Sequence, residues 1–176
     1  MYHNWFKLDP WFVPRYYIRD LWHPRSPLSA TSLVHRAFFS PEYPRSEVKK
    51  FERMLPEYES MIWPLSQMLP FVNVKNVLKN IIGWKEKTNH PRLFVIAGDL
   101  DTLMGVTLMQ RMATVYRKAL TTMLPGVFPQ QKLTDSETMT PEGVDFAIIK
   151  DSGHHVQNDL LWEEAAGKLG EFLDHL

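Results

Sequence analysis

Two apolar runs in the second half of the chain have the pattern of buried β-strands. Residues 92–97 contain LFVIA, which is apolar on both faces, as strands of a parallel sheet are. Residues 144–150 contain FAII, and turn-forming residues flank this second run on both sides. A long amphipathic helix is expected between them at 103–122, followed by a surface insertion at 124–144. Strand, helix and strand therefore predict an α/β protein with adjacent parallel strands.

Two helices should pack against these strands through apolar stripes at helical spacing. The stripe of the helix at 103–122 consists of Val106, Met109, Ala113, Tyr116 and Leu120. A terminal helix follows the second strand, and its predicted buried stripe consists of Leu161, Ala165, Leu169, Phe172 and Leu176.

The first half of the chain predicts a small helical module at 29–84. Helices are expected at 29–39, from Ser46, at 59–69 with a break at a proline, and from Asn73, which can cap the last one. Their expected buried residues include Leu33, Val34, Ala37 and Phe38, then Val48, Phe51, Met54 and Leu55, and finally Val74, Val77, Leu78, Ile81 and Ile82. A polar connection at 85–91 separates this module from the strands. We therefore divide the chain into a helical region, 1–84, and a core region, 85–176.

The composition narrows the possible functions. The 176 residues include 20 Lys plus Arg and 20 Asp plus Glu, so the formal net charge is zero and no nucleic-acid partner is expected. The absence of cysteine excludes disulfides, a thiolate nucleophile and a sulfur-ligated metal. We recognise neither a transmembrane segment nor a signal peptide, so an intracellular location is favoured. The first 28 residues are aromatic and interrupted by prolines, and contact with protein is favoured over contact with a membrane.

Each predicted strand ends in residues that can carry chemistry. Asp99 and Asp101 follow the first strand, and His154 and His155 follow the second. Gly153 can adopt backbone angles closed to other residues, which would present His154 from a sharp turn. A carboxylate that accepts a hydrogen bond from one imidazole nitrogen fixes the tautomer, and the other nitrogen can take a proton from a hydroxyl. We expect such a pair at the carboxyl edge of the sheet.

Plain structural roles are the alternative for each of these residues. An aspartate after a strand often caps the next helix, and a single histidine is often structural. Adjacent residues point in different directions, so His154 and His155 are unsuited to hold one metal ion together. The other histidines are scattered without ligand spacing. We expect no metal and no cofactor.

The order of these motifs resembles the carboxyl-terminal half of the α/β-hydrolase fold. AGDLD is the end of an apolar strand followed by Gly-x-x-Asp, and SGHH places Gly-His after a second strand. In that family the chain order is nucleophile, acid, histidine, with a helical cap often inserted before the acid. The resemblance implies that Asp101 is the acid and His154 the base, with Gln157 and Asp159 in the tail that follows. It also implies that 1–84 is the cap, since AFFSPEYP, ESMIWP and FVNVKNVL are similar to the caps of fungal esterase-like, lipase-like and epoxide hydrolase-like members.

The nucleophile of that family is missing from this sequence. No two of the eight glycines are four residues apart, so G-x-S-x-G does not occur. Ser60, Ser66 and Ser152 lack the strand, turn and helix context, and we assign none of them the role. The early strands and the oxyanion loop are also missing. We expect a partial α/β-hydrolase fold that supplies the acid and the histidine of an esterase and is inactive alone, with a missing amino-terminal half as partner and a small apolar ester as substrate of the complete protein.

Two other functions stay open. A non-catalytic remnant or interaction module would bind a partner or an apolar ligand through the helical cap, and its acid and histidine would be idle. Half of an epoxide hydrolase would instead work with an aspartate nucleophile and with cap tyrosines that hold the epoxide oxygen. Tyr16, Tyr17, Tyr43 and Tyr58 lie in that region, but the sequence selects none of them.

Overall fold

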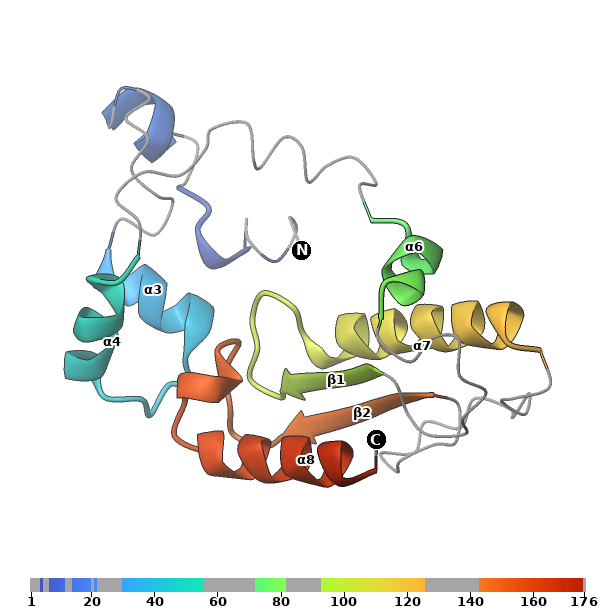
Figure 1. Ribbon diagram of the computed structural model, residues 1–176. Coiled ribbons are helices and arrows are strands. Elements are labelled where there is room, and N and C mark those ends of the chain that lie inside the picture. Colours follow the sequence, from blue (N-terminus) through green and yellow to red (C-terminus); the bar gives the residue numbers. More distant parts are fainter. Residues whose placement is uncertain are drawn as a thin grey trace.

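The computed structural model describes residues 4, 7–11, 14–19, 21, 30–55, 72–81, 93–125 and 143–175. The parallel strands of the described residues lie between the longer helices, and short helices lie near the carboxyl ends of the strands (Figure 1). The predicted helix at 59–69 and most of the predicted insertion lie outside the described residues. Among the helices that are described, none combines the length and the apolar character needed to cross a membrane.

The sheet of the described residues consists of two parallel strands, as the sequence predicts. Strand β1 (Leu93–Gly98) pairs with β2 (Val144–Ile149) in a register that runs from Leu93 opposite Val144 to Gly98 opposite Ile149. Both strands therefore end at the same edge. The connection between them includes helix α7 (Val106–Met123), which gives the described part of the chain its α/β character.

Helix α7 packs on one face of the sheet and begins later than the sequence predicts. Its buried Ala113 and Leu120 form a core cluster with Val95 of β1 and Val144 of β2. The predicted start at residue 103 is wrong, because residues 101–105 form a turn whose N–H groups are satisfied by an aspartate side chain instead of by the helix. The helix begins only after this turn.

Helix α8 (Trp162–Asp174) packs on the opposite face, as Figure 1 shows. Ala165 joins Ile149 in a small core cluster, and the ring of Phe172 stacks on Phe94 with centroids 5.3 Å apart. The predicted burial of Leu161 and Leu169 is wrong, since these side chains are 36% and 47% exposed. The described sheet has only two strands, so it is too narrow to cover the whole apolar face of α8. Leu176 lies outside the described residues.

Helices α3 (Thr31–Phe38) and α4 (Arg45–Glu52) pack on each other beside the carboxyl edge of the sheet. Their core joins Val34, Ala37 and Val48 to Leu103 of the turn after β1. The predicted burial of Met54 is wrong, because α4 ends at residue 52 and helical spacing no longer applies beyond it; Met54 is 74% exposed. The two helices therefore form a wall next to the ends of the strands.

Helix α6 (Val74–Lys79) begins at the predicted cap, where the Asn73 side chain accepts a hydrogen bond from the N–H of Asn76 at 3.2 Å. Leu78 is buried against α7 in the same cluster as Ala113 and Leu120, so α6 shares its core with the sheet layer. Val77 is 37% exposed, contrary to the prediction. The predicted boundary between residues 84 and 85, like Ile82, falls outside the described residues and stays a prediction.

Candidate functional site

Asp101 lies in the turn that follows β1, and both of its carboxylate oxygens are used. Oδ1 accepts hydrogen bonds from the backbone N–H groups of Leu103 and Met104, each at 2.8 Å. Oδ2 lies 2.8 Å from Nδ1 of His154. Burial by itself would raise the pKa of Asp101, but the hydrogen bonds from His154 and the two N–H groups outweigh it and lower the pKa. Asp101 is therefore an ionised hydrogen-bond acceptor.

The ionised Asp101 determines the tautomer of His154. A carboxylate can only accept, so Nδ1 of His154 carries the proton and donates it to Oδ2. This leaves Nε2 as the basic nitrogen of the neutral ring. The His154 side chain is 33% exposed, whereas that of Asp101 is 4% exposed. The imidazole is thus held from the protein side by a buried carboxylate and remains accessible to a reactant.

The ring of His155 packs against aromatic side chains of α3 and α4, and its nitrogens lie within hydrogen-bond distance of the side chains of Gln157 and Asn158. Its ring centroid lies 4.8 Å from that of Phe51 in an edge-on arrangement and 6.0 Å from that of Phe38. Burial, together with the neighbouring His154, lowers the pKa of His155, which favours its neutral form. Of the two adjacent histidines, the structure brings His154, the one that the resemblance implies, to Asp101.

Asp99 links the two turns at the edge of the sheet. Its Oδ1 accepts a hydrogen bond from the backbone N–H of Ser152 at 3.3 Å. Asp99 therefore has a structural role in the turn. The acid that meets the histidine is thus the second aspartate of AGDLD.

Two glycines allow the chain segments to approach closely behind this pair. A Cβ on Gly98 would lie 2.2 Å from the backbone oxygen of Gly153, and a Cβ on Gly153 would lie 2.5 Å from the backbone carbon of Phe39. The predicted reason for Gly153, a backbone conformation closed to other residues, is wrong: the positive φ of this turn, 55°, belongs to Asp151. Gly153 is required because there is no space for a side chain.

Asp159 joins the histidine turn to the end of α3, and sequence reasoning gave it no role. Asp159 is 1% exposed. Its carboxylate oxygens accept hydrogen bonds from Gly153 N at 2.7 Å, from Ser40 N at 2.7 Å and from Ser40 Oγ at 2.6 Å. The available signal was an aspartate five residues after the histidine in HHVQND. Nothing in the local pattern points to Ser40, which is 119 residues away.

The described residues contain no hydroxyl group hydrogen-bonded to His154. Ser40 donates its hydroxyl to Asp159, and Ser152 is fully buried with its Oγ unpaired. Ser60 and Ser66 lie outside the described residues. In the part of the chain that the structure describes, the pair of Asp101 and His154 thus has no hydroxyl group as a third partner.

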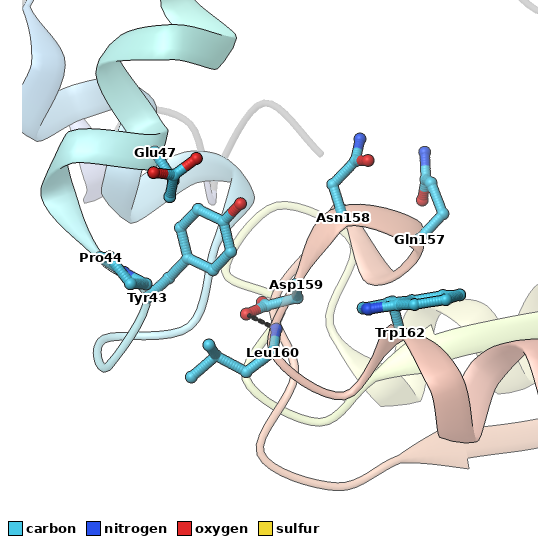
Figure 2. Close-up of a pocket in the computed structure, with 8 residues that line it drawn as sticks. All are labelled: Tyr43, Pro44, Glu47, Gln157, Asn158, Asp159, Leu160 and Trp162. Carbon is cyan, nitrogen blue, oxygen red and sulfur yellow. Dashed lines mark hydrogen bonds between the residues drawn. The ribbon is translucent and has the colours of Figure 1, made fainter.

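A cavity of about 430 Å³ lies on the other side of Asp159, between the start of α4 and the start of α8. Figure 2 shows Tyr43 and Glu47 on one side of this cavity and Asn158, Gln157 and Trp162 on the other. Neither Asp101 nor His154 lines it. Burial and the carboxylates of Glu47 and Asp159 raise the pKa of Tyr43, so this phenol stays protonated at neutral pH. Tyr58 and the side chains of Tyr16 and Tyr17 lie outside the described part of the chain.

Comparisons of the chain with protein-family models, with curated proteins and with solved structures gave no match. The hydrogen-bonded pair of Asp101 and His154 is therefore the feature of the described residues that most directly indicates a function.

Proposed function

We propose that this chain provides the acid and the histidine of a hydrolase that cleaves carboxylic esters, and that a serine outside the given sequence is the nucleophile. The observation that carries this proposal is the 2.8 Å hydrogen bond between Asp101 Oδ2 and His154 Nδ1 at the ends of adjacent parallel strands. The carboxyl edge of a parallel sheet is where α/β proteins place their reactive groups. The wall formed by α3 and α4 beside this edge fits the proposed cap.

The geometry suits general base catalysis. His154 Nε2 would take the proton of the serine hydroxyl as its oxygen forms a bond to the ester carbonyl carbon. The imidazolium would be stabilised by Asp101 and would then give its proton to the leaving alcohol oxygen as the ester bond breaks. Water would attack the acyl-serine in the second half of the reaction, with the same nitrogen as base. The oxyanion donors would come from the same missing polypeptide as the serine.

The walls of the site favour an apolar substrate. The ring of Phe38 lies 5.9 Å from that of His154, and Phe51 lies next to Phe38 at 5.7 Å. Aromatic side chains beside the base would contact the acyl or alcohol group of an ester. A small apolar ester is therefore the proposed substrate.

The first test compares the chain alone with its Asp101→Asn variant on a short-chain nitrophenyl ester. Both proteins should hydrolyse the ester at the same background rate, because neither contains the proposed nucleophile. Turnover that the Asp101→Asn variant abolishes would contradict the absence of a nucleophile in this chain.

The second test supplies the nucleophile. The genomic sequence upstream of the Met1 codon is searched for G-x-S-x-G, and the polypeptide that carries it is produced separately and mixed with this chain. Ester hydrolysis by the mixture supports the proposal. Stable association without hydrolysis contradicts it and favours an interaction module, and an aspartate in place of the serine favours epoxide hydrolysis.

A further inference from the structure

We infer that Asp159 is a positioning residue: it fastens the turn that carries His154 to the end of α3 and so holds the imidazole against Asp101. This inference rests on the proposed function, in which His154 is the base.

The carboxylate of Asp159 collects four hydrogen bonds from three segments. Oδ2 accepts from the backbone N–H groups of Gly153 and Ser40, both at 2.7 Å. Oδ1 accepts from the Ser40 hydroxyl at 2.6 Å and from the N–H of Leu160 at 2.8 Å. Hydrogen bonds to an ionised and buried acceptor are stronger than neutral ones. We call these four bonds the Asp159 clamp.

The Asp159 clamp acts on the residue just before His154, and a second bond acts on the residue just after it. Gly153 N is tied to Asp159, and His155 N donates to the backbone oxygen of Phe38 at 2.7 Å. Phe38 is the last residue of α3, and Asp159 is itself bonded to Ser40, two residues further along the chain. The backbone of His154 is thus fixed on both sides, and a displacement of about 1 Å at a base costs about 100-fold in rate.

A carboxylate is needed here, because all four neighbours are donors. An asparagine would direct its NH₂ group toward one or two of the backbone N–H groups, which can only donate, and would lose those bonds. The residue is 1% exposed, so water cannot take over these bonds. Asp159→Asn is therefore a substitution of nearly equal size that removes the chemistry of the clamp.

The experiment follows the Nδ1 proton of His154 by NMR in the chain alone. In the parent chain we expect a low-field resonance, since this proton is held by Asp101. In Asp159→Asn we expect exchange of this proton with water to be faster by about tenfold or more, or the resonance to be lost, while the circular dichroism spectrum stays that of a folded protein. The matched control is Asp151→Asn, which changes an exposed aspartate of the same turn and should leave the resonance unchanged.

A folded Asp159→Asn variant with an unchanged His154 resonance would overturn the inference. If that variant does not fold, the same measurement on Ser40→Ala tests the inference. This substitution removes the hydroxyl bond of the Asp159 clamp and leaves its three backbone N–H bonds in place. We expect about threefold faster proton exchange in Ser40→Ala, and the parent rate would overturn the inference. These outcomes are independent of ester hydrolysis, so a failure of the clamp is distinguishable from a failure of the proposed function.

Discussion

Three buried aspartates of the core region differ in what their carboxylate oxygens bind. Asp101 binds two N–H groups and a histidine, and Asp159 binds four donors. The oxygens of Asp145 are buried without a hydrogen-bond partner. The first two stabilise the arrangement at the strand ends, whereas the third is a cost to the fold.

Burial raises the pKa of Asp145, and the charges of Arg117 and His175 offset part of this effect. Because the folded state binds the Asp145 proton more tightly, the resulting stability is present below the ordinary pKa of 3.8 and is lost as the pH rises through the raised, folded-state value. As the pH rises through that value, the folded protein gains a buried charge whose oxygens have no hydrogen-bond partner.

We predict that Asp145→Asn increases the free energy of unfolding at pH 7 by about 1 kcal/mol, because it replaces, at nearly constant volume, a buried carboxyl group whose charged form is disfavoured by burial. The measurement is denaturant unfolding at pH 7 and at pH values closer to 4, where the difference from the parent chain should narrow. Asp151→Asn is the exposed control and should change little. A variant that is less stable than the parent at pH 7 would show that Asp145 is stabilising.

Contacts between residues could be predicted where both residues follow strands of the sheet. They could not be predicted where segments far apart in the sequence meet. An aspartate and a histidine could be expected close together because both follow strands, and parallel strands end together; the choice of Asp101 and His154 came from the resemblance. The partners of Asp159 could not be predicted, since Ser40 precedes it by 119 residues and no local pattern links them. The catalytic roles themselves stay a proposal.

At the scale of elements, the turn between β2 and α8 depends on space as much as on backbone conformation. Gly153 packs against the backbone of Phe39, whereas Gly167 and Gly170 in α8 have no atom within 4 Å of an added Cβ. The sequence predicted an important glycine at 153 but attributed it to the backbone conformation. Close packing of two backbones leaves no mark in a single sequence.

We predict opposite effects of adding a methyl group at these glycines. Gly153→Ala should lower the free energy of unfolding by about 1–3 kcal/mol, because its Cβ would lie 2.5 Å from backbone that cannot rotate away. Gly167→Ala should raise it by about 0.5–1 kcal/mol, since alanine is the better residue inside a helix with open space around it. Thermal or denaturant unfolding measures both, and equal effects at the two sites would contradict the close packing.

The helices show how far hydrophobic periodicity reaches. The pattern found α3, α4, α6, α7 and α8, and it identified buried Leu78, Ala113 and Leu120. It misassigned Leu169 and Met54, because burial depends on the width of the sheet and on where a helix ends. Both are tertiary properties that a period of 3.6 residues does not contain.

At the scale of the whole molecule, the sheet of the described residues is covered on both faces and at the carboxyl ends of its strands. Helices α7 and α8 cover the two faces of β1 and β2, and the wall of α3 and α4 lies where both strands end (Figure 1). A two-stranded sheet is marginally stable without such cover. Among the described residues β1 pairs with β2 alone, so the side of β1 that faces away from β2 has free backbone hydrogen-bonding groups. In the proposed complete hydrolase, a strand of the second polypeptide would pair with this side of β1.

In the proposed hydrolase, Asp101 orients His154, and His154 takes the proton of a serine hydroxyl from another polypeptide. The most direct measurement is kcat/KM for nitrophenyl ester hydrolysis by the complemented protein, compared among the parent chain, Asp101→Asn and Asp99→Asn. We predict that Asp101→Asn lowers kcat/KM by about 10⁴-fold, because the imidazole loses its carboxylate, whereas Asp99→Asn stays within about tenfold of the parent. Equal activities of the parent and Asp101→Asn, or an equal loss in both variants, would contradict the claim.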